Sequence, residues 1–508
     1  MERYVLLTGA TGLVGQYLLR DFLRKNIPVA VLIRSRGDER AHQRMERVVG
    51  HWEKEQGSYL PRPICIEGDL TSEGMALDNE SRRWIAKHCD RVLHNAASLT
   101  FDGADRNGEP WLSNLTGTQN VLELSREAGI RQWHYMSTAY VCGRRPGPVY
   151  ESELDCGQEF RNEYEQSKLE AEQAVRSASF LDSLTVYRPA IIVGDSKTGY
   201  TSSYHALYLY LQLIFMLDRF LDTPRDENGC RHIELRLDLT GEERRNLVPV
   251  DWVAAVTTYL FENVKCHGQT YNLTPREPIT VKQIEAACEH YFNFCGVTFE
   301  GPGKTTPEQR NDLEKLFYEQ LSTYSSYWDS EPIFDSTNTC QMAPHLPCPV
   351  LDEPILHRLT DYAIQDRWGN RRKRPSELPF DVAMMLEDAS AESPAIRATD
   401  RLLVVGLDLW GPGGGQWHVQ VDRNRPWDLE VGLAKECDVV YRSDVGTFVA
   451  LVRGEVSARH AIRQGLVEVV PSGDKLSDPA ELLDLFANRP GELAPQQPHN
   501  KQASRQTV

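Results

Sequence analysis

The sequence lacks the features of a disulfide-bonded, metal-binding or nucleic-acid-binding protein. Its 11 cysteines are scattered, with no Cys-x-x-Cys pair and no Cys/His cluster at zinc spacing. We therefore expect free thiols in a reducing, cytoplasmic setting, and no metal site. Positive charge is also scarce, since the formal net charge is −17. This argues against nucleic acid as a partner, because phosphate binding needs clustered positive charge.

Long apolar runs are missing as well. No stretch approaches the roughly 20 apolar residues of a membrane-spanning helix, and the first residues lead directly into an apolar strand, without the pattern of a signal peptide. The nearest candidate, residues 200–221, reads as an amphipathic helix or lid, or alternatively as an ordinary core helix. It is interrupted by Ser203, His205, Gln212, Asp218 and Arg219. Peripheral membrane contact stays open.

At 508 residues the chain predicts two or more domains. Short apolar runs alternate with helical stretches up to about residue 194, which predicts an α/β fold with a Rossmann-type, doubly wound parallel sheet and a substrate-binding cap after it. The predicted strands are Tyr4–Leu7, Val29–Ile33, Ile64–Glu67, Arg91–His94, Trp133–Met136 and Leu184–Tyr187.

The rest of the chain predicts further domains. The first domain, residues 1–280, includes an alternating strand at His232–Leu239 and a helix at Pro249–Asn263. Residues 281–385 read as a helical extension that includes Val281–Phe292 and 304–330, and residues 386–399 as a linker. A smaller α+β domain is expected at 400–490, and residues 491–508 as a disordered tail. Strand signals in that domain are Leu402–Leu409, Trp417–Val421, Asp428–Val431 and Val439–Tyr441.

A glycine-rich loop directly follows the first strand and opens a helix. Glycine permits a tight turn and close approach of a pyrophosphate, while the helix N-terminus offers free N–H groups and partial positive charge. The alternative, a tight turn without a ligand, carries less weight at this position. The predicted cofactor contacts in this loop are Thr8, Gly9, Thr11, Gly12, Leu13, Val14 and Gly15.

The ends of the next strands predict which dinucleotide binds. Arg34 and Arg36 follow the second strand, where an acidic residue would favour NAD, and a guanidinium suits the 2′-phosphate of NADP. The alternative is solvated surface charge. Asp69 could accept a hydrogen bond from adenine. Further contacts are expected where the third and fourth strands end, at Leu70, Asn95, Ala96 and Ala97.

Tyr164 and Lys168 are the predicted catalytic pair. Four residues apart on a helix, they lie on one face, directed toward the cofactor. A tyrosine has an unperturbed pKa of about 10. A neighbouring ammonium and a positive nicotinamide favour its phenolate, so Tyr164 can act as an acid or base near neutrality. Thr138, at the end of a strand, would hold the substrate oxygen.

These motifs resemble the extended short-chain dehydrogenases/reductases over residues 4–280. The segments 187–199 and 246–253 are similar to the branch of fatty acyl-CoA reductases and thioester reductases. The resemblance implies NADP(H)-dependent reduction of a fatty acyl thioester to an aldehyde or alcohol, with Thr138, Tyr164 and Lys168 as the catalytic set. It implies supporting or cofactor contacts at Asn114, Ser137, Arg188 and Pro189.

The C-terminal domain resembles sterol carrier protein type 2 over residues 410–486, which implies an apolar tunnel for acyl chains or sterols. A small α+β dimerisation module without ligand is the alternative. Two other functions stay open: an NADP-dependent sterol or hydroxysteroid dehydrogenase, and a non-catalytic nucleotide- and lipid-binding protein. Each would have a lipid small molecule as its partner.

Overall fold

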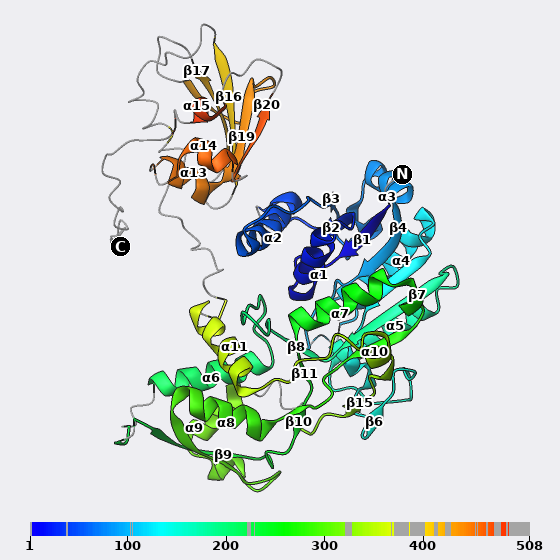
Figure 1. The fold of residues 1–508 in the computed structure, drawn as a ribbon, viewed down its shortest axis with the longest axis vertical. Helices are drawn as coiled ribbons and strands as arrows, with labels where there is room; N and C mark the ends of the chain where they lie inside the picture. Colours follow the sequence, from blue (N-terminus) through cyan, green and yellow to red (C-terminus); the bar gives the residue numbers. More distant parts are fainter. Residues whose placement is uncertain are drawn as a thin grey trace, which may run out of the picture. The chain divides into compact units, whose positions relative to one another are not determined.

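The chain folds into two units, seen in a computed structural model (Figure 1). One unit comprises residues 1–36 and 40–372, and the other residues 37–39 and 373–508. The predicted tail and the predicted linker, except Leu386, lie outside the described residues. The structure describes residues 3–486 apart from 37–38, 102, 104, 221–224, 228, 321–327, 367, 370–385, 387–401, 411–414, 422–427, 453, 455, 464–465, 472–478 and 484–485.

A seven-stranded parallel sheet organises the first unit, in the order β12-β7-β5-β4-β1-β2-β3. The chain starts at the centre, winds outward to β3 and then returns to build the other half. The predicted doubly wound sheet is therefore confirmed. Its strands are β1 Tyr4–Thr8, β2 Val29–Ile33, β3 Ile64–Glu67, β4 Cys89–His94, β5 Gln132–Met136, β7 Ser183–Pro189 and β12 Thr270–Leu273.

Helices cover both faces of this sheet because successive strand residues point to opposite sides (Figure 1). In β1, Val5 and Leu7 pack under α1 (Leu13–Arg24), α2 (Ala41–Gln56) and α7 (Val250–Glu262). Leu6, between them, packs against the helices of the opposite face. Those helices are α3 Asn79–His88, α4 Gly117–Ala128 and α5 Glu163–Arg176.

A smaller subdomain with its own apolar core follows the sheet, where the cap was expected. Its parallel pair β9 (Arg231–Leu237) and β14 (Phe294–Phe299) packs with helices, and α8 spans the predicted Val281–Phe292. Further α-helices of the first unit are α6 Leu207–Phe220, α9 Asp312–Gln320, α10 Thr337–Met342 and α11 Glu353–Gln365. Short strand pairs are β6 Pro148–Val149 with β15 Ile333–Phe334, β8 Ile191–Val193 with β11 Leu247–Pro249, and β10 Arg244–Arg245 with β13 Ile279–Thr280.

The second unit is a mixed α+β structure with a separate core. Its five-stranded sheet has the order β18-β17-β16-β19-β20, in which β16 pairs antiparallel with β17 and parallel with β19. The likeness to sterol carriers stays a prediction. The elements are β16 Leu403–Trp410, β17 Gly415–Val421, β18 Asp428–Val431, β19 Val439–Asp444, β20 Val467–Pro471, α13 Val445–Val452, α14 Ala458–Arg463 and α15 Pro479–Leu483.

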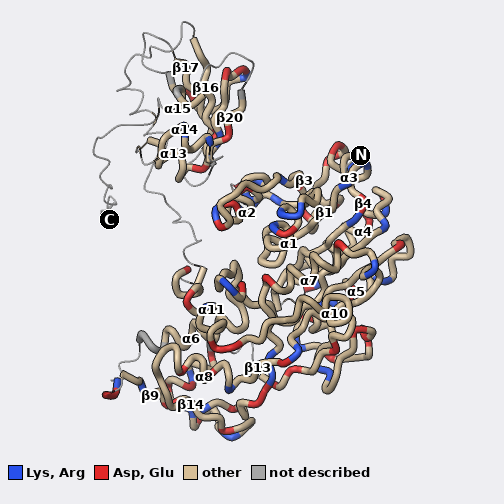
Figure 2. Tube along the Cα trace, in the orientation of Figure 1, with Lys and Arg blue, Asp and Glu red and all other residues tan. Residues whose placement is uncertain are grey.

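Charge is interspersed over both units. Along the described trace, Lys and Arg alternate with Asp and Glu instead of gathering on one element (Figure 2). Within the described residues, none of the helices is both long enough and apolar enough to cross a bilayer.

Candidate active site

The glycine loop between β1 and α1 has no room for a side chain at Gly9 or Gly15. Gly9 has a φ of +70°, and a Cβ there would lie 2.7 Å from the backbone nitrogen of Ala96. A Cβ on Gly15 would lie 2.0 Å from the Gly9 carbonyl oxygen. Gly12 begins α1 without a side-chain cap, so the helix N-terminus presents its own N–H groups. This cradle fits the pyrophosphate of a dinucleotide.

Thr8 joins the loop to the neighbouring strand end. Its buried hydroxyl accepts hydrogen bonds from the backbone N–H groups of Asn95 and Ala96, both at 3.1 Å. The Asn95 side chain donates to the Gly9 carbonyl at 3.3 Å. The structure therefore brings together the predicted residues that follow β1 and β4; Ala97 lies exposed beside them.

Arg34 lies at the carboxyl end of β2 with its side chain 56% exposed, and its guanidinium is 3.4 Å from Asp69. Burial alone would raise the pKa of Asp69, but hydrogen bonds from Thr71 and the charge of Arg34 lower it. The backbone carbonyl of Leu70, a predicted cofactor contact, accepts a hydrogen bond from the Asn120 side chain at 2.7 Å. The end of β2 thus presents a guanidinium that solvent, or a ligand, can reach.

Arg44 is a residue at this edge that the sequence interpretation missed. From the first turn of α2, its guanidinium donates to the Thr11 hydroxyl at 3.2 Å and to the Arg34 carbonyl. The signal was an arginine on the helix face that also carries Ala41 and Met45, a face that the structure buries. Arg34 and Arg44 together place two positive charges beside the glycine loop.

Thr138 and Tyr164 meet beyond the carboxyl end of β5. Tyr164 lies in the first turn of α5, which Asn162 caps by accepting from the Glu165 N–H. Desolvation raises the pKa of Tyr164 to about 12, although a side-chain hydrogen bond with Thr138 opposes that shift. The Thr138 hydroxyl also reaches the Pro189 carbonyl at 3.5 Å. Two hydroxyl groups therefore lie together at this end of the sheet.

Lys168 lies one turn further along α5, fully buried against β5. Its ammonium donates to the Tyr135 hydroxyl at 2.9 Å and to the Met136 carbonyl at 2.8 Å. Desolvation lowers the pKa of Lys168 to about 7, and the charge of Glu172 limits the fall. The amine can therefore change its charge near neutral pH.

Ser137 and Arg188, predicted as cofactor contacts, both point their side chains at Glu172. The Ser137 hydroxyl donates to this carboxylate at 2.7 Å, and the Arg188 guanidinium pairs with it at 2.6 Å, with all three groups buried. A cofactor contact from Ser137 or Arg188 would accordingly use the backbone. Both assignments stay predictions.

Asn114 supports the site from a single π-helical turn before α4. Its side-chain amide donates to the Ser98 carbonyl at 3.1 Å and to the Ser167 hydroxyl at 3.0 Å, and its oxygen accepts from the Ser98 N–H. Asn114 thus joins the loop after β4 to the helix that carries Tyr164 and Lys168, and its supporting role in the site stays a prediction.

The segment 194–199, which carried much of the family resemblance, ties the cap to the cofactor helix. Asp195 accepts from the Tyr17 hydroxyl of α1 at 3.0 Å. Gly199 has a φ of +75°, and a Cβ there would lie 2.3 Å from the Arg358 carbonyl of α11. The glycine is needed because α11 packs against this turn.

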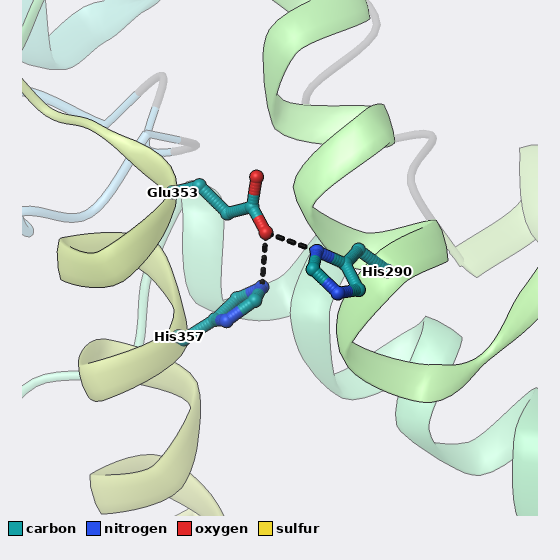
Figure 3. Close-up of side chains that lie close together, drawn as sticks. All are labelled: His290, Glu353 and His357. Atoms are coloured by element: carbon teal, nitrogen blue, oxygen red, sulfur yellow. Dashed lines mark hydrogen bonds and ion pairs between the residues drawn. The ribbon is translucent and has the colours of Figure 1, made fainter.

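Among the described residues, His290, Glu353 and His357 form the one group that could hold a metal ion (Figure 3). They lie on α8 and α11. Glu353 already pairs with His290, and the His357 Nε2 already donates to the Ala287 carbonyl at 3.0 Å. These contacts describe a polar link between two cap helices, and we assign no metal there.

The chain is similar to a family of NAD-binding domains and to several reductases. Residues 7–257 match a family of NAD-binding domains described as Male sterility protein. The chain is 25% identical over 401 residues to aldehyde reductase lnaA of Aspergillus flavus, covering 71% of this chain and 36% of that protein. It is 24% identical over 362 residues to the L-2-aminoadipate reductase large subunit of Eremothecium gossypii, covering 66% and 25%.

The chain thus spans about a third or less of the length of these relatives. Among solved structures, it resembles the terminal R domain from the myxalamid PKS-NRPS biosynthetic pathway, with a TM-score of 0.59 and 21% identity over 72% of this chain and 92% of that one. That likeness concerns the fold. Residues 7–257 thus resemble this family of NAD-binding domains, and the doubly wound sheet and the glycine cradle fit a nicotinamide dinucleotide.

Proposed function

We propose that this enzyme reduces an acyl thioester to an aldehyde with NADPH, releasing the thiol. The observation that carries the proposal is the meeting of Thr138 and Tyr164 above β5, with Lys168 behind them. Relatives named as an aldehyde reductase and an aminoadipate reductase support it. NADPH supplies the hydride when bound. The acyl group we propose first is a fatty chain, and an aminoacyl chain is the second candidate.

The residues of the site suit each stage of such a reduction. The hydroxyl groups of Thr138 and Tyr164 would donate to the thioester carbonyl oxygen and stabilise the negative charge that develops there. If the aldehyde is reduced further to an alcohol, Tyr164 would deliver the proton to the same oxygen. Lys168 would orient the ribose and assist Tyr164 electrostatically.

The purified chain, mixed with NADPH, tests the proposal. We expect nicotinamide absorbance to fall when octanoyl-CoA, octanoyl-pantetheine or an aminoacyl-pantetheine is added, and a hydrazine reagent to trap the aldehyde. A 3-ketosteroid serves as the comparison substrate. Turnover with the ketosteroid alone would replace this function by the sterol dehydrogenase alternative, and turnover with none of them would refute the proposal.

We further propose NADPH as the preferred cofactor, because Arg34 and Arg44 both lie beside the end of β2. Arg44→Gln keeps a donor toward Thr11 but removes the charge. We expect its KM for NADPH to rise about tenfold or more, with the KM for NADH nearly unchanged, since a guanidinium–phosphate contact contributes on the order of 1.5–3 kcal/mol. Equal increases for both cofactors in steady-state kinetics would contradict this preference.

A further inference from the structure

Beneath the active site, five buried side chains lie next to one another between the catalytic helix and the glycine loop. Lys168 Nζ lies 2.9 Å from the Tyr135 hydroxyl, and Thr118 lies next to that hydroxyl. The Thr118 hydroxyl is 3.0 Å from His94 Nε2, and His94 Nδ1 is 2.8 Å from the Thr8 hydroxyl. Each of the five residues is at most 1% exposed. They come from α5, β5, α4, β4 and β1.

The hydrogen bonds of Thr8 determine which way the protons of the neighbouring side chains point. The Thr8 oxygen already accepts two backbone N–H groups, from Asn95 and Ala96, so its own proton goes to His94 Nδ1. The proton of His94 therefore lies on Nε2 and is donated to Thr118. Burial and the charge of Lys168 lower the pKa of His94 to about 3, so the ring stays neutral.

The hydrogen bonds of Thr118 likewise determine where the proton of the Tyr135 hydroxyl can point. Thr118 donates its single proton to the Asn114 carbonyl at 2.5 Å and accepts from His94, so toward Tyr135 its oxygen can only accept. With its proton directed to Thr118, the Tyr135 oxygen can only accept from Lys168. The Tyr135 ring adds a cation–π contact, since Lys168 Nζ lies 4.5 Å from its centroid.

Two of the three N–H bonds of the Lys168 ammonium are therefore committed to β5, one to Tyr135 and one to the Met136 carbonyl. The third is left for a cofactor or substrate. The titratable groups that face Lys168 are Glu172 from its own helix, Tyr135 from β5 and His94 from β4. Of these, Tyr135 is the one whose hydroxyl contacts the amine directly.

We propose that Tyr135 is a positioning residue, held in one hydroxyl orientation by Thr118 and His94, and that it sets both the direction and the charge of Lys168. This inference rests on the proposed function, because it concerns the amine that assists Tyr164. It links the glycine loop to the catalytic helix through side chains alone. Loss of the Tyr135 hydroxyl removes an acceptor that stabilises the charged amine, so the pKa of Lys168 falls further below its ordinary value.

Tyr135→Phe tests the proposal because it keeps the ring but removes the hydroxyl. In the full chain we expect the alkaline limb of the kcat–pH profile to move down by about one pH unit, the size of shift that a hydrogen bond to a charged group produces. At pH 6 the Kd for NADPH should stay within about twofold of wild type. Tyr187→Phe is the matched control, since that hydroxyl is equally buried on β7 but contacts His134 at 2.9 Å.

Substitutions at Thr118 separate the orienting role from general packing. Thr118→Val keeps the shape but offers Tyr135 no acceptor, so we expect a shift in the same direction as for Tyr135→Phe, but smaller. Thr118→Ser keeps the hydroxyl and should restore the wild-type profile. A purely structural role would lower stability in these variants without moving the limb, and an unmoved limb in a folded Tyr135→Phe enzyme would overturn the proposal.

A measurement without catalysis distinguishes this inference from the proposed function. In protein with 13C-labelled lysine, the Lys168 Cε resonance, assigned with Lys168→Arg, should titrate near pH 7 in wild type. It should titrate at lower pH in Tyr135→Phe or, if that variant does not fold, in Thr118→Val. Absence of thioester-dependent NADPH oxidation would refute the function alone, whereas an unshifted Cε titration would refute the role of Tyr135.

Discussion

At the scale of single residues, the proposed chemistry depends on one phenol. Tyr164→Phe removes the hydroxyl that meets Thr138 but keeps the ring in the first turn of α5. We expect aldehyde reduction to fall by about 10²–10⁴-fold, the usual contribution of a general acid, while NADPH binding stays unchanged. Stopped-flow measurement of NADPH oxidation by an aldehyde checks the rate. Fluorescence titration with NADPH checks the binding. Activity within about threefold of wild type would remove Tyr164 from the mechanism.

The glycines of the loop differ in what they tolerate. Gly15→Ala places a Cβ 2.0 Å from the Gly9 carbonyl oxygen, and backbone on both sides must move to relieve the overlap. We expect a loss of about 1–3 kcal/mol in urea unfolding, together with weaker NADPH binding. Gly12→Ala, whose Cβ would lie 3.5 Å from the same oxygen, is the control and should lose less than about 1 kcal/mol. Equal losses in both would contradict this account.

Site residues that form a local sequence pattern could be predicted from the sequence. Site residues whose role depends on tertiary partners could not. The glycine spacing and the Tyr164–Lys168 pair are visible in short windows. Tyr135 and His94 look like ordinary core positions of two strands, because their meeting with Thr118 requires the sheet order and the packing of α4. Arg188 pairs with a carboxylate on another element, 16 residues away in sequence, which no spacing rule predicts.

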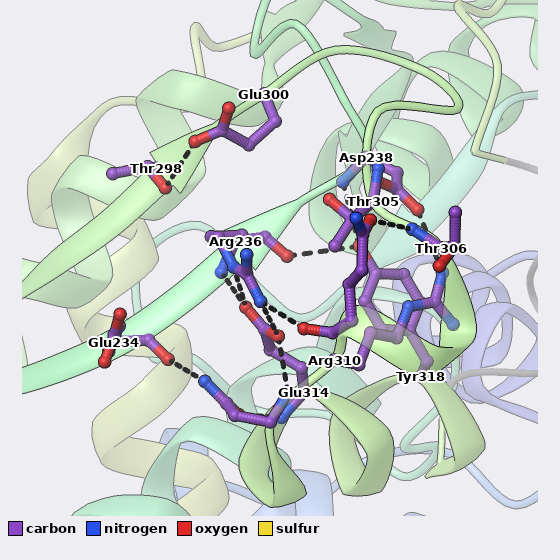
Figure 4. A network of polar contacts seen from close by, with 12 residues as sticks. Glu234, Arg236, Asp238, Thr298, Glu300, Thr305, Thr306, Arg310, Glu314 and Tyr318 are labelled. Atoms are coloured by element: carbon purple, nitrogen blue, oxygen red, sulfur yellow. Dashed lines mark hydrogen bonds and ion pairs between the residues drawn. The ribbon is translucent and has the colours of Figure 1, made fainter.

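At the scale of helices and strands, elements with a clear local sequence pattern were also predicted better than elements that depend on distant contacts. Six of the seven strands of the large sheet were predicted nearly to their observed ends, because apolar runs between helices indicate buried parallel strands, whereas the edge strand β12 was not predicted. Helix α8 was predicted to the residue, and in the structure Thr280 and Gln283 form a capping box at its start. The cap was harder, because the two-residue strands β10 and β13 carry no periodicity. Its polar network, where Arg236 pairs with Glu314 and Arg310 with Asp238, depends on distant segments (Figure 4).

Glu172 stabilises the packing of α5 on the sheet through a buried ion pair. Burial raises the pKa of this carboxyl, but the charges of Arg188 and Arg176 outweigh it and hold the pKa below its ordinary value. Glu172→Gln leaves Arg188 buried without its counter-charge, so we expect a loss of about 3–5 kcal/mol in urea unfolding at pH 7. Because the folded pKa is lowered, this contribution is present above pH 4.5 and is lost as pH falls below it.

The difference between wild type and Glu172→Gln should therefore narrow in unfolding curves recorded from pH 5 downward. Glu127→Gln is the matched control, since its partner Arg82 and its own carboxylate are partly exposed. An exposed pair of this kind contributes about 0–1 kcal/mol. If the two variants lost equal stability at pH 7, the buried pair would not be what holds α5 in place.

At the scale of the whole molecule, the two units have separate cores, and every residue assigned to the site lies in the first. A chain ending at Arg372 should therefore fold and bind NADPH with a Kd within about twofold of the full chain, because no cradle or catalytic residue is removed. If the second unit binds lipid as proposed from its resemblance, the KM of the shortened chain should rise for long-chain thioesters but not for acetyl-pantetheine. A large loss of NADPH affinity on titration would show instead that the first unit depends on the second for its fold.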